Sequence, residues 1–254
     1  MTTMTRKQTG NDTTRLSRIA SVAPLVEAPA PSKLKTLKNS RSSKETLKQI
    51  VDAWEVFVAK KYEFTPNSSD AELAIVGLTY SAKDVERFSL ELRKFQRVKR
   101  GYLTVNTSQI GIFLSALINH GTDSDYVIHV QGLYGPTHLC MFNTKNVTVN
   151  GDVGLFFGWA MKSGNVTVNG NASWCLAQSL KGGSILVTGN AGKEAAEYMK
   201  GGTLIVRGNL DPHNDMGSYS SGGIVLVEGS KCGWKARHAK ITLYHRGQLV
   251  PDSK

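Results

Sequence analysis

The sequence predicts a mainly β protein, a right-handed parallel β-helix of about six turns with a small N-terminal α-rich cap and a disordered basic N-terminal arm. Three observations predict this class. Short aliphatic segments ending in glycine recur every 19 residues in the second half. Apolar residues recur at helical spacing before them. The first 43 residues have no apolar periodicity. We therefore expect an arm over 1–43, a capping domain over 44–121 and a β-helix over 122–254.

The arm carries much of the positive charge. The chain of 254 residues has 31 Lys and Arg against 20 Asp and Glu, a net charge of +11. Residues 1–62 hold twelve of the basic and five of the acidic residues. The arm is read as a solvated extension, as a tail that binds nucleic acid or an acidic partner, or as a cleaved organelle transit peptide. We expect a cytoplasmic protein, or an imported one if the transit-peptide reading holds, and no membrane-spanning helix.

The cap begins with a helix. Ser42 and Glu45 have capping-box spacing, and apolar residues follow at helical intervals, so a helix is expected over 44–60. The segment 71–80 (AELAIVGLTY) reads as a short strand.

Two further helices are expected in the cap. Ser81 is placed to cap one whose buried face is formed by Val85, Phe88, Leu92 and Phe95. Another, over 108–119, is apolar nearly all round, and Gly121 fits its C-cap. Basic residues cluster near the end of the former helix, and they read as a solvated face or as a phosphate-binding footprint: Arg93, Lys94, Arg97, Lys99 and Arg100.

The repeat is defined by aligned columns. Each copy ends in a glycine that we interpret as a structural turn residue: Gly132, Gly151, Gly170, Gly189, Gly208 and Gly229. The positions four and two residues before each glycine are aliphatic in every copy, from Ile128 and Val130 onward. A further apolar column contains Phe142, Met161, Leu180 and Met199. A small-residue column contains Gly135, Gly154, Ser173 and Gly192, and another column contains Leu139, Gly158, Ala177 and Ala196. A set of turn glycines follows at Gly164, Gly183, Gly202 and Gly223.

Aligned columns at a fixed period indicate stacking. Each turn of chain lies on the previous one at the strand spacing of about 4.8 Å, so that like residues stack on like. An open end of such a stack exposes unpaired strand edges and needs a cap, which the helical segment can supply. The segment 240–247 (KITLYHRG) is expected to add a last irregular strand.

The repeat resembles a known family. The segment Gly189–Gly208 (GNAGKEAAEYMKGGTLIVRG) is similar to the GXGXG repeat domain, and the resemblance covers about residues 126–230. That family includes the C-terminal domain of the glutamate synthase large subunit and one of the subunits of formylmethanofuran dehydrogenase. The resemblance implies a right-handed β-helix that packs against catalytic domains or subunits and carries no catalytic residues itself.

One loop and three cysteines are the candidates for chemistry. Asp211, His213 and Asp215 lie in a two-residue expansion of the repeat and could bind a metal or act as acid and base, although one loop supplies few convergent groups. Cys140, Cys175 and Cys232 occupy no common column and read as structural thiols. Trp159 and Trp174 lie off the aliphatic columns, where they would mark a partner surface if exposed or equally pack a corner of the coil.

Three functions from different classes remain open. The first is a non-catalytic scaffold or interaction subunit of a larger complex, with protein partners, no cofactor and no metal. The second is a subunit of a glutamate-synthase-like or formylmethanofuran-dehydrogenase-like redox complex. The third is a β-helix enzyme that acts on polysaccharide, or a protein that contacts nucleic acid through residues 1–43.

Overall fold

The structure is a computed structural model that describes residues 41–60, 67–95, 98–99, 102–103, 107–211, 216–233 and 239–251. All of these belong to one compact unit, residues 39–254. Most of the expected arm, residues 1–40, lies outside the described residues. Residues 41–43, which the expected arm included, are part of a helix.

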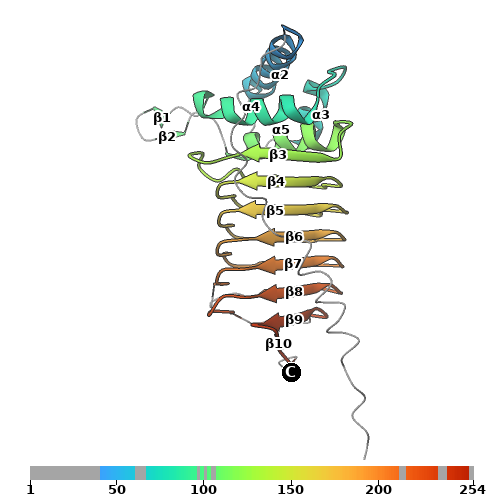
Figure 1. Ribbon diagram of the computed structural model, residues 1–254, viewed down its shortest axis with the longest axis vertical. Helices are drawn as coiled ribbons and strands as arrows, with labels where there is room; N and C mark the ends of the chain where they lie inside the picture. Colours follow the sequence, from blue (N-terminus) through green and yellow to red (C-terminus); the bar gives the residue numbers. More distant parts are fainter. Residues whose placement is uncertain are drawn as a thin grey trace, which may run out of the picture. The chain divides into compact units, whose positions relative to one another are not determined.

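The second part of this unit is a parallel β-solenoid, which confirms the predicted fold class (Figure 1). One sheet of eight strands runs along the stack in the order β10-β9-β8-β7-β6-β5-β4-β3. Six successive parallel pairings join β3 to β9, and β10 closes the end as an antiparallel hairpin with β9. The strands are β3 Asp125–His129, β4 Asn146–Asn150, β5 Asn165–Asn169, β6 Ser184–Val187, β7 Thr203–Val206, β8 Ile224–Val227, β9 Thr242–His245 and β10 Gln248–Leu249.

The strands bury the two aliphatic columns in the interior. Val147 pairs with Val166, and Val166 with Ile185, so the 19-residue register holds through the middle coils. Seven residues stack in this column: Tyr126, Val147, Val166, Ile185, Leu204, Val225 and Leu243. All of them are buried. Because side chains alternate with period two, the residues of this column face the interior and the residues between them face the other side of the sheet, where Leu186 and Ile205 are also buried.

The first coil departs from the predicted register. Tyr126, not Ile128, pairs with Val147, so this coil is 21 residues long between equivalent positions. The shift of two residues keeps the same face buried because side chains alternate with period two. The shift also moves Gly132 out of the glycine column. The backbone of Val130 and Gln131, and not Gly132, lies against Gly151. Further along this coil, Cys140 and Asn143, not Leu139 and Phe142, align with Gly158 and Met161.

One side of each coil has an unusual backbone. Cys175, Ala177 and Ser179 all have positive φ, at 59°, 57° and 57°, and the residues between them do not. The same alternation occurs at 138, 140 and 142, at 156, 158 and 160, and at 194, 196 and 198. We call this the left-handed side. The coil then turns into the next strand at Gly164, Gly183, Gly202 and Gly223, whose φ values are 85°, 77°, 80° and 117°.

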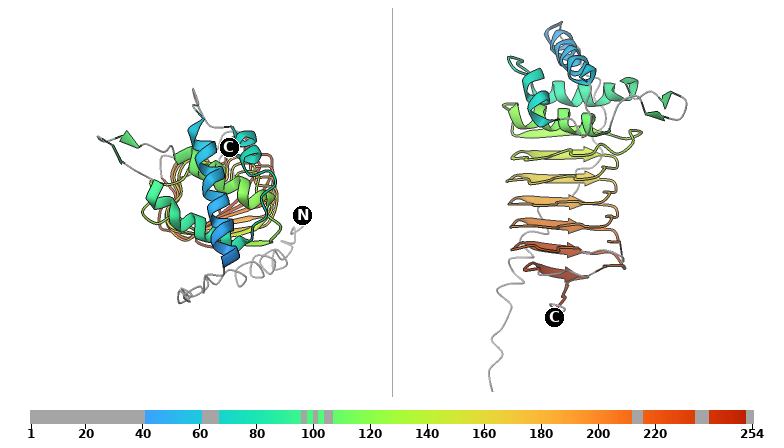
Figure 2. Two further views of the ribbon diagram at one scale, coloured as in Figure 1. Left: turned by 90° about the horizontal axis from the view of Figure 1, so that it is seen from above. Right: turned by 180° about the vertical axis from the view of Figure 1, so that it is seen from behind.

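Four helices form the cap. They are α2 Arg41–Ala59, α3 Ser68–Ala74, α4 Ala82–Phe95 and α5 Thr107–His120, and two short strands, β1 Val98–Lys99 and β2 Tyr102–Leu103, form a hairpin. Seen from above, the helices lie over the first coil (Figure 2). Their shared core is a cluster of aromatic rings, in which Trp54 and Phe113 have centroids 5.3 Å apart. Phe57, Phe88 and Phe95 complete this cluster.

Two expectations for the cap are wrong. The segment 71–80 is no strand, because α3 occupies its first half. The Asn67 side chain caps this helix by accepting a hydrogen bond from the Ser69 amide at 3.1 Å. Ser42 lies inside α2 and is not its N-cap. The second helix is confirmed as α4. At its start, the Ser81 amide and hydroxyl donate to the Asp84 carboxylate at 3.1 and 2.7 Å, and the Asp84 amide donates to the Ser81 hydroxyl at 3.4 Å. Val85, Phe88 and Leu92 on this helix are buried as expected.

The cap covers the open end of the solenoid through specific contacts. The Ser89 hydroxyl on α4 accepts a hydrogen bond from the His129 amide of β3 at 3.0 Å. On α5, the Ser115 hydroxyl donates to the His138 carbonyl at 2.9 Å, and the Asn119 amide donates to the Met141 carbonyl at 2.9 Å. These bonds satisfy backbone groups that the first coil cannot pair with a preceding coil.

Glycines on α5 permit this close approach. A Cβ atom at Gly111 would lie 1.8 Å from the Thr137 carbonyl oxygen. The Gly121 amide donates to the Leu117 carbonyl at 3.1 Å and so ends α5 as expected, but its φ is not positive. Glycine is needed there because a Cβ would lie 2.0 Å from the Tyr126 hydroxyl.

Candidate functional site

The expected loop at 211–215 is only partly described. Asp211 is half-buried, and its amide donates to the Ala191 carbonyl at 3.1 Å, as a regular member of the stack would. His213 and Asp215 lie outside the described residues. Within the described ranges, no group of three or more His, Cys, Asp or Glu residues is placed to hold a metal ion. The proposed pairing of Asp211 with these two side chains therefore stays a prediction.

Polar side chains along one corner form a ladder parallel to the axis. The Asp152 carboxylate accepts from the Asn171 amide at 2.7 Å, and the Asn171 side chain accepts from the Asn190 amide at 2.8 Å. In the same way, the Asn190 side chain accepts from the Asn209 amide at 2.8 Å, and the Asn209 side chain accepts from the Lys231 amide at 3.0 Å. Each bond joins one coil to the next, so these residues hold the stack together.

A second ladder runs where the strands begin. The Asn146 amide group donates to Asp125 at 3.0 Å, and the Asn146 oxygen accepts from the Asn165 amide at 3.0 Å. The Ser184 hydroxyl donates to Asn165 at 2.7 Å. Hydrogen bonds from Ser124 and Asn146 hold the pKa of the Asp125 carboxyl below its usual value. The Asn and Asp residues of the repeat thus have structural partners.

The cysteines lie apart and are unpaired. Burial raises the pKa of the Cys140 thiol, and burial with a hydrogen bond to Glu194 raises the pKa of Cys175 to about 12. Burial raises the pKa of Cys232 to about 11. A raised pKa suppresses the thiolate form at neutral pH, which agrees with a structural role.

Large aromatic side chains are exposed on the left-handed side. Trp174, Tyr198 and Tyr219 are 49%, 46% and 51% exposed. Tyr198 and Tyr219 stack with ring centroids 5.4 Å apart and an interplanar angle of 14°. The Lys193 ammonium lies 5.4 Å from the centroid of the Trp174 ring. Of the two alternatives for the tryptophans, exposure describes Trp174, whereas Trp159 is half-buried and packs against Phe142.

A column of lysines, which we had not predicted, runs beside these aromatics. Lys162, Lys181 and Lys200 are exposed and occur at intervals of 19 residues. The Lys181 amide donates to the Met161 carbonyl at 2.9 Å, and the Lys200 amide to the Leu180 carbonyl at 2.7 Å, so each lysine lies one coil after the previous one. The Ser221 amide donates to the Met199 carbonyl and the Lys240 amide to the Ser220 carbonyl, both at 2.8 Å. These two residues therefore extend the column by two more coils. We call Lys162, Lys181, Lys200 and Lys240 the lysine stripe.

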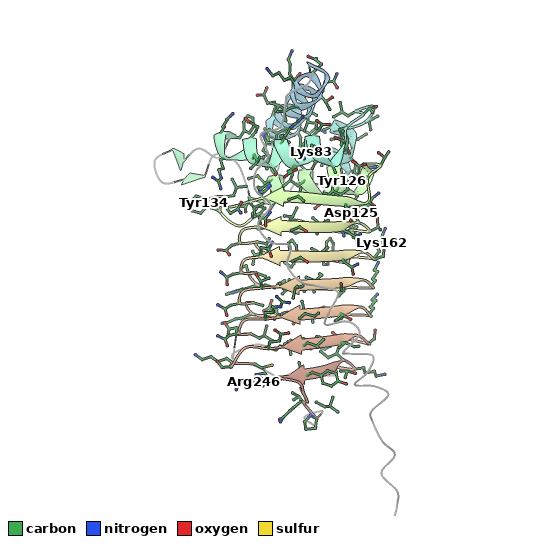
Figure 3. The ribbon with its side chains drawn as sticks, in the orientation of Figure 1. Lys83, Asp125, Tyr126, Tyr134, Lys162 and Arg246 are labelled. Atoms are coloured by element: carbon green, nitrogen blue, oxygen red, sulfur yellow. The ribbon has the colours of Figure 1, made fainter. Side chains whose placement is uncertain are left out.

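The lysine stripe has no carboxylate partner in the part of the chain that the structure describes. Lys162 lies near the Phe142 ring, 5.9 Å from its centroid. The Lys162 side chain projects outward at the edge of the stack where the strands begin (Figure 3). The Glu197 carboxylate accepts from Gln178 at 3.2 Å and the Asp125 carboxylate from Asn146 at 3.0 Å, and neither forms an ion pair with a lysine of the stripe.

The cap has its own exposed apolar surface. Leu73 and Val76 are 66% and 73% exposed, and they line an open depression of about 590 Å³ together with Leu78, Tyr80 and His120. His120 lies 3.8 Å from the Glu72 carboxylate at its rim. We call this the cap depression.

No described helix combines the length and hydropathy that crossing a bilayer requires. No protein-family model, curated protein or solved structure matches the chain.

Proposed function

We propose that the chain is a non-catalytic scaffold and interaction subunit that works inside a larger assembly. The observation that carries this proposal is the cap depression, where Leu73 and Val76 expose most of their surface to water. Contiguous exposed apolar surface is costly in water, and burying it against a partner recovers that free energy. A protein surface with complementary apolar side chains fits this depression.

The way the solenoid uses its polar groups supports a structural role. Asn171, Asn190 and Asn209 direct their side-chain oxygens at the next coil, and Ser89 and Ser115 direct theirs at the first coil. Groups that are committed to such bonds stiffen the stack, and a stiff stack holds its surfaces at fixed separations.

We also propose kinship with the GXGXG repeat family. The support comes from the left-handed side, where positions i, i+2 and i+4 share positive φ. Glycine adopts this conformation without steric cost, so a G-x-G-x-G sequence would suit it. Here Gly158 and Gly217 keep that residue, and larger residues fill the other positions. The three unpaired cysteines support a reducing compartment, such as the cytoplasm, as the site of action.

The test is purification of the tagged full-length chain from its own host extract, with the partners identified by mass spectrometry. The variant Leu73→Glu/Val76→Glu places two charges in the cap depression and should release the partner proteins. Lys44→Glu/Lys83→Glu, with two exposed residues on other cap helices, is the control. Equal recovery of partners by both variants would remove the cap depression from the proposal. A wild-type chain that is recovered alone and turns over a substrate would contradict the proposed function.

A further inference from the structure

The lysine stripe is a straight row of positive charge. Its members lie at successive coils, so Lys162, Lys181 and Lys200 are spaced by about 4.8 Å along the axis. Lys240 lies two coils beyond Lys200, which gives a row about 19 Å long from Lys162 to Lys240. The backbone register sets the spacing of the Cα atoms from which these side chains extend.

Such a row is electrostatically unfavourable for an isolated chain. Like charges at this spacing repel one another, and no described carboxylate lies within ion-pair distance of these lysines. The asparagine ladders show how the same fold places neutral residues at equivalent intervals. A polyanion laid along the axis would neutralise several of the lysines at once.

Exposed tyrosines lie close to the stripe along the chain. Tyr198 is two residues before Lys200, and Tyr219 is two residues before Ser221, the member of the column that lacks a charge. Both rings are about half exposed and stack on each other. A positively charged track flanked by aromatic rings is the arrangement with which proteins bind single-stranded nucleic acid, the amines contacting phosphates and the rings stacking on bases.

We infer that the lysine stripe and the Tyr198–Tyr219 pair form a binding surface for single-stranded nucleic acid. This inference deepens the proposed function, since it rests on the chain being an interaction subunit and names one partner class. A single strand fits better than a duplex or an acidic protein, because only its bases are free to stack on the two tyrosines. The stripe is separate from the arm at 1–43, for which nucleic-acid contact was a sequence-based expectation.

The experiment measures binding of a fluorescent single-stranded oligo(dT) to the full-length protein by anisotropy over a range of salt concentrations. The triple variant Lys162→Gln/Lys181→Gln/Lys200→Gln should weaken binding on the order of 10- to 100-fold at 0.1 M salt. It should also reduce the slope of log affinity against log salt by about 2, since each phosphate contact in a single strand contributes about 0.7. Lys44→Gln/Lys48→Gln/Lys83→Gln removes the same charge from the cap and should change both quantities much less.

A second pair of variants tests the stacking. Tyr198→Asn/Tyr219→Asn retains a residue type that tolerates positive φ, and it should weaken oligo(dT) binding on the order of tenfold. Tyr134→Asn is the matched control, since Tyr134 is 61% exposed at the opposite edge of the stack (Figure 3). Circular dichroism checks that every variant is folded.

Two results would overturn the inference. Equal weakening by the stripe and cap triple variants would show that only net charge matters. Equally tight binding of duplex DNA or polyglutamate, without any effect of the tyrosine variants, would point to a generic acidic partner. Neither result touches the partner purification described above, so the failure of this inference and the failure of the proposed function are distinguishable.

Discussion

At the residue scale, the solenoid uses the left-handed backbone conformation at residues other than glycine. Among the residues that the structure describes, thirteen non-glycine residues have φ between 50° and 61°. This conformation costs roughly 1–2 kcal/mol per residue, so the hydrogen bonds between coils must compensate for it. Ala177 and Ala196 are members of this set, and both are completely buried. Alanine has no preference for positive φ, so sequence patterns alone could not locate the left-handed side.

Arg246 is the member of this set most easily improved. It has φ 50° and precedes Gly247, with φ 76°, in the two-residue turn between β9 and β10. Turns of this kind favour Asn-Gly, so Arg246→Asn should raise the free energy of unfolding by about 0.5–1 kcal/mol. Urea denaturation measures the change. Arg207→Asn, at an exposed position outside the turn, is the control, and an equal gain there would contradict the explanation.

His138 should make stability depend on pH. Burial lowers the pKa of this imidazole, which stacks on Phe156 with ring centroids 5.0 Å apart. The unfolded chain then binds a proton more readily than the folded chain below about pH 6.5, so stability falls as pH decreases through this region. Urea denaturation at pH 7.5 and 5.5 should show a smaller decrease in His138→Asn than in wild type. An unchanged decrease would mean that other groups produce it.

At the element scale, the junction of α5 with the first coil is the closest contact. Gly111→Ala would press a methyl group against the Thr137 carbonyl and should destabilise the protein by about 3 kcal/mol or more, because backbone atoms cannot yield as a side chain can. Thermal unfolding followed by circular dichroism measures this. The exposed helical substitution Lys83→Ala should leave the transition within about 0.5 kcal/mol of wild type. Similar stability of both variants would contradict the tight junction.

Ser89 protects the free edge of β3. Its buried hydroxyl accepts from the His129 amide and donates to the Glu86 carbonyl. Ser89→Ala leaves that amide unpaired, and we expect a loss of about 1–3 kcal/mol in unfolding free energy. Hydrogen exchange at the His129 amide should speed up in parallel. Unchanged exchange would show that another group protects this edge. Ser69→Ala, at an exposed position of α3, is the control for replacing a helical serine by alanine.

The elements also show where prediction from sequence succeeded. The middle coils were predictable because Val147, Val166 and Ile185 repeat at one interval, and stacking demands that interval. The first coil was misaligned because Ile128 and Tyr126 lie on the same face, and the expected aliphatic column favoured the wrong one. The segment after Ala71 reads equally as strand or helix, and the Asn67 cap decides the outcome. The lysine stripe was visible in principle, as one residue type repeating every 19 positions.

At the scale of the whole molecule, the cap and the solenoid share one continuous hydrophobic core. Trp54 and Phe113 in the cap belong to the same buried cluster as Val147, Val166 and Val187 in the solenoid. Because this core runs without a break from one part to the other, the cap depression and the lysine stripe are held at a fixed separation. Fixed separation between two binding surfaces is what a scaffold needs to align different partners.

The central claim is that this body acts by binding, and the native particle mass tests it most directly. The tagged chain is isolated from its host extract at low salt, treated with nuclease, and measured by size-exclusion chromatography with light scattering. We predict a mass well above the 27.6 kDa of the chain for the wild type, falling toward 27.6 kDa for Leu73→Glu/Val76→Glu. A wild-type particle of 27.6 kDa would contradict the claim.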